Sequence, residues 1–177
     1  CWDGALVCEV SECTTEPPDW QDDPGGYQLI AVLYGGVVLN DEGVQFGGDS
    51  NDATGDLFAA FDDNGNVRGL AVQLDPGFGP YNGQIVYEMT IRALDQNNQG
   101  GAGDHITFQY YDASEDVILV ISETYTFVVN DAWGTLLAPI VFNEADLSCP
   151  ECTETSLPSN QPCNSLTADD CTNGLNS

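Results

Sequence analysis

The side chains that could perform chemistry in this chain are few and mostly of one kind. Acidic residues number 29, whereas the basic residues are Arg68 and Arg92 and the single histidine is His105. Nucleophilic catalysis needs a serine, cysteine or threonine beside a positioned base, and no nucleophile motif accompanies His105. Paired carboxylates can hydrolyse glycosides, but so many acids produce chance pairs and no pair stands apart. We therefore expect no catalytic residues and a protein that is not an enzyme.

Calcium is the one metal that the oxygen-rich turns favour. Ca²⁺ binds roughly six to eight oxygen atoms from carboxylates, amides and carbonyls, and two short stretches concentrate such groups. The candidate ligands are Asp62, Asp63, Asn64 and Asn66 in one stretch, with Asp49, Asn51 and Asp52 in the other. The first stretch lacks the distal bidentate glutamate of an EF-hand and also suits an ordinary hairpin turn. We therefore expect either no cofactor or calcium, and these residues can equally form an ordinary hairpin turn.

Aromatic residues in predicted loops could stack on sugars. Phe78 and Tyr81 lie in the sequence FGPY, and Trp133 lies in NDAWG. A flat ring offers a sugar an apolar surface, but large amphipathic rings also cover the ends of a β-structure. The sequence is consistent with two roles for these residues: stacking on a glycan, or packing at the ends of the β-structure.

The cysteines lie only in the two ends of the chain. The ends are poor in apolar residues, so disulfides, worth ~2–4 kcal/mol each, would be needed to order them, which indicates an extracellular protein. Zinc is the alternative, because Cys149-Pro-Glu-Cys152 has the two-residue spacing of a zinc knuckle, although the N-terminal spacings do not match. An odd number leaves one thiol free, bonded to another chain, or paired outside this sequence. The disulfide candidates are Cys1, Cys8, Cys13, Cys149, Cys152, Cys163 and Cys171.

The net charge of −27 limits the partners. Binding to nucleic acid or to anionic membranes depends on lysine and arginine, so neither partner is expected. No apolar run reaches the ~18 residues of a membrane helix, so membrane insertion is not expected either. Because the chain begins at Cys1 without a methionine or signal peptide, we expect a mature product or a piece of a longer protein.

Alternating hydrophobic patterns predict about eight strands between residues 27 and 144. The stretch 85–94 points its odd-numbered residues inward, and 106–110 points its even-numbered residues inward. Asn64-Gly65 predicts a hairpin joining 57–61 to 67–74, Gly35-Gly36 predicts a bulge within 27–40, and a last strand is expected over 136–142. The predicted fold is an all-β sandwich, jelly-roll or Ig-like. Residues 1–26 form a cysteine-containing N-terminal segment, 27–144 the sandwich, and 145–177 a cysteine-rich tail.

Several motifs occur in order: GDLFAAF, RGLAV, FGPY with YEMTIR, GDHITFQYYDAS, and ETYTFVVND. Together they resemble a non-catalytic β-sandwich repeat module of large secreted and cell-surface proteins. The segment CWDGALVCEVSEC resembles the cysteine-bearing linker that joins such modules. The resemblance implies a place in adhesins, secreted enzymes or fibrous appendages, and it supplies no catalytic residues.

These observations predict an extracellular structural protomer of a fibre, filament or surface assembly. Its tails would join neighbours by adding a strand to an open sheet edge, by disulfides, or by both. A tail that meets a different surface on the next copy gives head-to-tail growth, so the chain itself is the expected partner. The alternative is a carbohydrate- or surface-binding adhesin module of a larger secreted protein, with glycans as partners.

Overall fold

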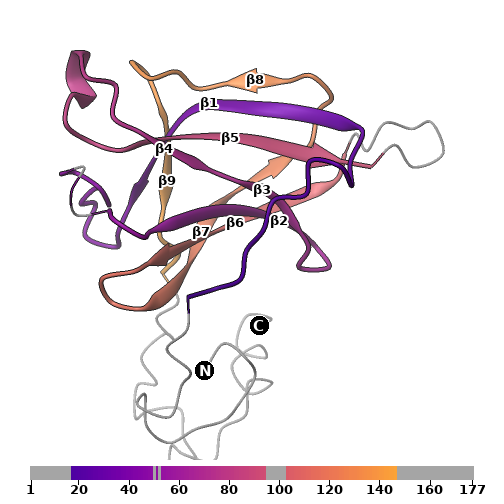
Figure 1. The fold of residues 1–177 in the computed structure, drawn as a ribbon, viewed down its shortest axis with the longest axis horizontal. Coiled ribbons are helices and arrows are strands. Elements are labelled where there is room, and N and C mark those ends of the chain that lie inside the picture. Colours follow the sequence, from indigo (N-terminus) through magenta and orange to yellow (C-terminus); the bar gives the residue numbers. More distant parts are fainter. Residues whose placement is uncertain (1–16, 50, 52, 95–102, 147–177) are drawn as a thin grey trace, which may run out of the picture. The chain divides into compact units, whose positions relative to one another are not determined.

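The computed structural model describes residues 17–49, 51, 53–94 and 103–146. The described residues up to Ala145 belong to one compact unit. Within them the chain forms nine strands and one short helical turn, so the predicted all-β class is confirmed (Figure 1). None of the described helical residues forms a helix long and apolar enough to cross a membrane.

The elements follow one another at short spacing. They are β1 (Leu29–Leu39), β2 (Leu57–Asp62), β3 (Val67–Leu70), β4 (Val72–Leu74), η2 (Gly79–Tyr81), β5 (Val86–Ala93), β6 (His105–Asp112), β7 (Val117–Thr126), β8 (Ala132–Trp133) and β9 (Ile140–Asn143).

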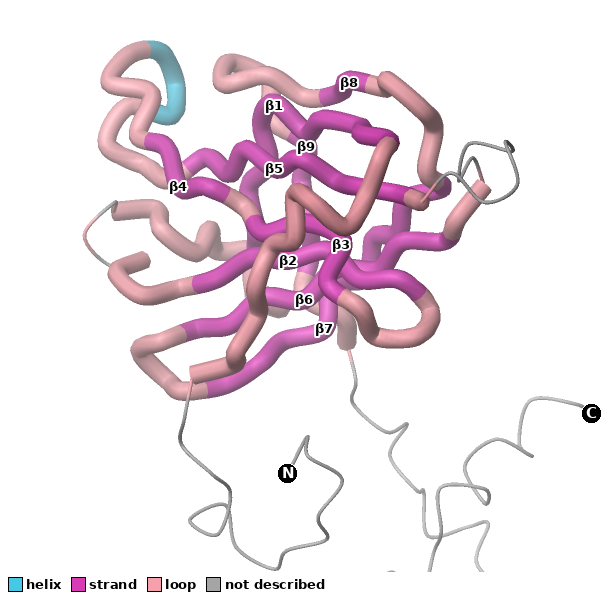
Figure 2. The backbone as a smooth tube through the Cα atoms, turned by 45° about the vertical axis from the view of Figure 1, so that its right-hand side comes forward, coloured by secondary structure: helices cyan, strands magenta, loops and turns pink. Residues whose placement is uncertain are grey.

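Two sheets share these strands. The five-stranded sheet has the order β4-β5-β1-β8, with β9 also paired to β1, and the four-stranded sheet has the order β3-β2-β6-β7. β1 runs parallel to β8 and β9, whereas the other pairs are antiparallel. Side chains from both sheets form one core, in which the rings of Phe58 and Tyr87 meet at 5.5 Å. The arrangement is consistent with a β-sandwich (Figure 2).

The alternation in β5 and β6 is confirmed. Tyr87, Met89 and Ile91 in β5 are buried in the core, whereas the residues between them are half-buried. In β6, Phe108 and Tyr110 are buried and the intervening residues face outward. Period-two burial arises because successive side chains of a strand point to opposite faces of the sheet.

The predicted bulge in β1 is also confirmed. The register of β1 against β5 shifts between Leu33 and Gly36. A Cβ atom on Gly35 would overlap the carbonyl oxygen of Thr135, so only glycine permits this close approach of two backbones. The segment after β8 thus lies against β1 at the bulge.

The predicted hairpin between β2 and β3 is confirmed, but its second arm is shorter than expected. Gly65 takes a φ of 78°, and its N–H donates to the Asp62 carbonyl at 2.9 Å. β3 then ends at Leu70, because the chain crosses to the other sheet at Ala71. The Ala71 N–H donates to Phe58 of the four-stranded sheet, whereas Val72 pairs with β5. The predicted single strand over 67–74 is therefore two strands in two sheets.

The start of the predicted last strand is wrong. Thr135 and Ala138 bridge each other and close a turn, and Pro139 has no N–H to donate to a ladder. β9 therefore begins at Ile140 instead of at residue 136.

Residues 17–28, here called the N-terminal strap, cross the side of the body where β3 and β5 approach each other. The Trp20 ring lies 5.2 Å from the Phe61 ring, and Asp22 pairs with Arg92 of β5 at 2.7 Å. Figure 1 shows this segment in dark indigo, leading into β1. Residues 17–26, which the sequence assigns to the N-terminal segment, thus pack on the body.

Candidate functional site

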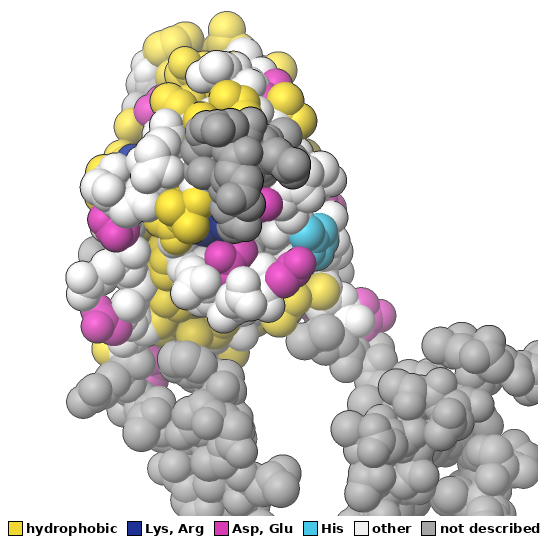
Figure 3. Space-filling view, turned by 90° about the vertical axis from the view of Figure 1, so that its right-hand side faces the viewer, with side chains coloured by type: hydrophobic (Ala, Val, Ile, Leu, Met, Phe, Trp, Pro, Cys, Tyr) yellow, Lys and Arg dark blue, Asp and Glu magenta, His cyan; other side chains and the backbone are white. Residues whose placement is uncertain are grey.

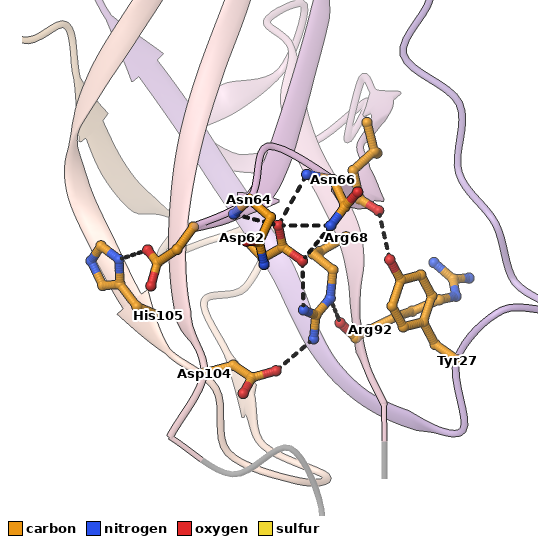
Figure 4. Close-up of polar contacts among 10 residues, drawn as sticks. Tyr27, Asp62, Asn64, Asn66, Arg68, Arg92, Asp104 and His105 are labelled. Carbon is orange, nitrogen blue, oxygen red and sulfur yellow. Dashed lines mark hydrogen bonds and ion pairs between the residues drawn. The ribbon is translucent and has the colours of Figure 1, made fainter. Parts of the chain in front are cut away.

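The three side chains that can carry positive charge lie at one corner of the body. Arg68 comes from β3, Arg92 from β5 and His105 from the first position of β6. Each is paired with aspartate, as Figure 4 shows for Arg68 and His105. Because these are all the basic residues and the only histidine of a strongly acidic chain, this corner is a candidate site.

The Arg68 guanidinium connects three parts of the body. Its Nε–H donates to the carbonyl of Arg92, and its other nitrogens lie 3.3 Å from Asp62 and 2.9 Å from Asp104. The guanidinium also lies 4.9 Å from the centre of the Tyr27 ring, in the strap. Arg68 is only 4% exposed. All these contacts hold the two sheets and the strap together, so Arg68 is a structural cation.

Asp62 organises the β2–β3 turn. Its carboxylate accepts hydrogen bonds from the backbone N–H groups of Asn64 at 2.9 Å and Asn66 at 3.0 Å, and from the Asn66 side chain. Burial raises the pKa of Asp62, but the hydrogen bonds from Asn66, Asn64 and Arg68 outweigh burial and lower that pKa below its usual value. Both Asp62 oxygens thus already accept hydrogen bonds, with which a calcium ion would compete.

The other predicted calcium ligand of this turn, Asp63, contacts His105. The two atoms Oδ1 and Nδ1 lie 2.7 Å apart, and the side chains are 71% and 47% exposed. Figure 3 shows the histidine at the surface beside acidic side chains. Within the described ranges, no three histidine, cysteine or acidic side chains form a group that could hold a metal ion. Calcium at Asp62, Asp63, Asn64 and Asn66 stays a prediction.

Two adjacent hollows share Asp62 and Asp63 as a common wall. One, of about 300 Å³, lies between the turn and the start of β6, where Arg68 and His105 line it. The other, of about 660 Å³, lies against the outer face of β2 and β6, and Trp20 of the strap closes one side. We call the two hollows together the strap cleft. It combines an aromatic wall with carboxylates and neutral polar groups.

Tyr87, Tyr110 and Asp56 form a hydrogen-bonded network inside the core, and none of them lines either hollow. The Tyr110 hydroxyl donates to Asp56 at 2.5 Å and lies 3.0 Å from the Tyr87 hydroxyl. The other Asp56 oxygen accepts from the Ala113 N–H at 2.9 Å. Burial raises the pKa of Tyr87 and of Tyr110. These groups satisfy one another, which is what a polar network inside a core requires.

The predicted glycan-stacking residues lie in different surroundings. Phe78 is 56% exposed and precedes η2, which contains the half-buried Tyr81. Trp133 lies in β8, where its ring stacks on Tyr125 at 4.3 Å and packs against the core. The structure thus places Phe78 and Tyr81 in one loop and covers one face of Trp133. The sequence missed Trp20, whose proline-rich surroundings indicate a linker.

The outer face of the five-stranded sheet carries exposed apolar side chains on β1, β4 and β9, whereas β5, between β4 and β1, presents Glu88, Thr90 and Arg92 there. β1 presents Ile30 and Tyr34, β4 presents Val72 and β9 presents Val141, all between 42% and 60% exposed. The strand register places them on the side opposite the core. We call these four residues the apolar face. On that side of the described strands of this sheet, Glu88 is the one acidic residue.

The fold and these surfaces define an all-β protein built on two packed sheets. No protein-family model matches the chain, and comparisons with curated proteins and with solved structures give no match. The predicted disulfide and zinc residues lie outside the described residues, so their pairing remains a prediction. They are Cys1, Cys8, Cys13, Cys149, Cys152, Cys163 and Cys171.

Proposed function

We propose that the chain is a non-catalytic, extracellular structural protomer that assembles with copies of itself into a fibre, filament or surface layer. The body would be a sandwich of the jelly-roll or Ig-like type. One observation carries the proposal: the apolar face is exposed on a chain whose net charge is −27.

The apolar face has the properties of an interface. Ile30, Tyr34 and Val72 are 45%, 49% and 60% exposed, and grouped exposed apolar residues mark interaction sites. Arg92, on the same side of β5, is paired with Asp22.

Electrostatics favours a second copy as the occupant of the apolar face. Two molecules of equal negative charge repel each other over most of their surfaces. The described strands of this face carry one acid, Glu88, and Asp22 beside them is paired with Arg92, so two copies would meet little repulsion there.

β7 offers a second point of attachment. Its outer edge meets the chain after β9, where Ala145 donates to Val120 and Glu144 bridges Ile121. After Ile121, the Glu123 side chain accepts hydrogen bonds from Asn143 of β9, and the backbone of β7 pairs with no other described strand on this edge. An unpaired edge accepts an added strand. A tail from a neighbouring copy is our candidate for that strand, and disulfides would then fix the joint.

Sedimentation velocity over a concentration series tests the apolar-face interface. We expect reversible association that strengthens with added NaCl and weakens in Tyr34→Asp and Val72→Asp. Val44→Asp is the matched control, because Val44 is 58% exposed in a turn and Val72 is 60% exposed in the sheet. A molecule that stays monomeric throughout, or an equal effect of the Val44 and Val72 substitutions, would reject this interface. Negative-stain microscopy of the native material then shows whether the assembly is fibrous.

A further inference from the structure

We propose that the strap cleft binds a neutral oligosaccharide. The inference rests on the four-stranded sheet and the strap, and is independent of the apolar face on the other sheet. It also differs from the stacking set that the sequence predicts, because Phe78, Tyr81 and Trp133 do not line the two hollows of the cleft.

Trp20 supplies the aromatic surface. Its ring lies 5.2 Å from Phe61 at an interplanar angle of 73°, and Phe61 is itself only 6% exposed. This contact fixes the indole, while the half-buried side chain still lines the larger hollow. A large amphipathic ring held in this way offers an apolar surface with little loss of side-chain entropy when a ligand binds.

β6 supplies neutral hydrogen-bonding groups to the same hollow. Thr107 and Gln109 alternate with the buried Phe108 and therefore point away from the core. Both line the hollow, and among the described residues neither side chain has a hydrogen-bond partner. A hydroxyl and an amide each donate and accept. Sugar hydroxyls do the same, so the two chemistries match.

The charged groups of the cleft favour a neutral ligand over an acidic one. Asp62, Asp63 and Asp104 line it, and the one guanidinium, Arg68, is already paired with Asp62 and Asp104. A uronate or a sulfate ester would meet these carboxylates on a chain of net charge −27. A neutral hydroxyl can instead donate to the exposed carboxylate of Asp63.

The size of the cleft suits more than one sugar unit. Small-molecule sites commonly measure about 300–1,000 Å³. The two hollows, of about 300 Å³ and about 660 Å³, share the wall formed by Asp62 and Asp63. A chain of sugars that starts at Trp20 in the larger hollow would reach the smaller one by passing over the exposed side chain of Asp63.

Native electrophoresis in gels cast with soluble polysaccharides tests the site. The neutral probes are hydroxyethylcellulose, xyloglucan, galactomannan and laminarin, and alginate is the acidic comparison. We expect at least one neutral polysaccharide to retard the protein. Trp20→Ala should weaken this binding about tenfold or more, and Gln109→Ala should weaken it measurably. Phe78→Ala is the matched control, because Phe78 is an exposed aromatic residue outside the cleft.

Gln109→Ala keeps the test decisive if Trp20→Ala disturbs the strap, because the Gln109 side chain has no described partner to lose. Circular dichroism of each variant reports whether it has folded. Retardation by no neutral polysaccharide, or by alginate only, overturns the proposal. Retardation that both cleft variants retain, or that Phe78→Ala removes, overturns it as well.

Discussion

At the scale of single residues, Arg68 is the least exposed charged residue of the described part of the chain. Its guanidinium is buried and donates to the Arg92 carbonyl while it pairs with Asp62 and Asp104. Moving a charge from water into the protein interior costs free energy. Removal of one member of a buried ion pair leaves the other member charged, buried and without a partner. Substitution of Arg68 should therefore lower the free energy of unfolding by more than substitution within an exposed ion pair does.

We expect Arg68→Met to lower the free energy of unfolding by about 3 kcal/mol, because Asp62 and the Arg92 carbonyl lose their buried partner. Arg92→Met is the control. It breaks a pair with Asp22, whose side chain is 27% exposed, so the loss should be about 1 kcal/mol. Urea unfolding measures both values. Equal losses would show that Arg68 is no more important than a peripheral ion pair.

Three tyrosines make the protein sensitive to alkali. Burial raises the pKa of Tyr125 to about 12, and although the Val128 N–H lowers it, the hydrogen bond to Asp131 raises it further. Burial also raises the pKa of Tyr87 and Tyr110. In the unfolded chain a tyrosine ionises near pH 10, so above about pH 10 the unfolded state binds fewer protons than the folded state.

The contribution of these tyrosines to the free energy of unfolding should therefore be fully present below about pH 10. It should fall as the pH rises toward about 12. The ultraviolet absorbance of tyrosinate, recorded with circular dichroism, measures this. Tyr87, Tyr110 and Tyr125 should ionise only as the fold opens. In denaturant, the control, all seven tyrosines should titrate together. Reversible ionisation of all seven without any loss of circular dichroism would contradict the prediction.

At the scale of elements, the sequence predicts the strands with a regular hydrophobic alternation and the tight turns set by neighbouring residues. Alternation identifies β5 and β6, and Asn64-Gly65 identifies the β2–β3 turn, because a strand period and a tight turn are set by neighbouring residues. The sequence does not predict the crossing at Ala71, because hydrophobicity does not indicate which sheet a residue joins. The sequence around Trp20 and Trp133 indicates loops, since their partners Phe61 and Tyr125 become neighbours only after the sheets pack.

The close approach of β3 and β5 depends on Gly69. A Cβ atom there would lie 2.6 Å from the Thr90 carbonyl oxygen and 3.1 Å from Met89. Gly69→Ala should therefore destabilise the protein by about 1–3 kcal/mol, the usual cost of overpacking.

Gly25→Ala is the matched control for Gly69→Ala, because its added Cβ meets only Asp23, at 3.6 Å. It should change the unfolding free energy by less than about 0.5 kcal/mol. Thermal and urea unfolding measure both variants. If Gly69→Ala is as stable as Gly25→Ala, the two strands are not in tight contact.

At the scale of the whole molecule, repulsion among the carboxylates destabilises the folded state, which burial of the core stabilises. The chain carries 29 acidic and 2 basic residues, and both arginines are already paired with aspartates of the same chain. The remaining carboxylates repel one another, and folding brings them closer together. This repulsion is screened by salt, since the Debye length falls from about 30 Å at 0.01 M to about 3 Å at 1 M.

Added salt should therefore raise the midpoint of urea unfolding steadily between about 0.01 M and about 1 M. Urea is the suitable denaturant because it adds no charge of its own. Choline chloride is the control for NaCl, since screening depends on ionic strength and not on the identity of the cation. A low protein concentration keeps the association of copies from adding to the effect. A flat or falling midpoint would show that repulsion does not limit stability, and a rise with NaCl alone would point to a bound cation instead of screening.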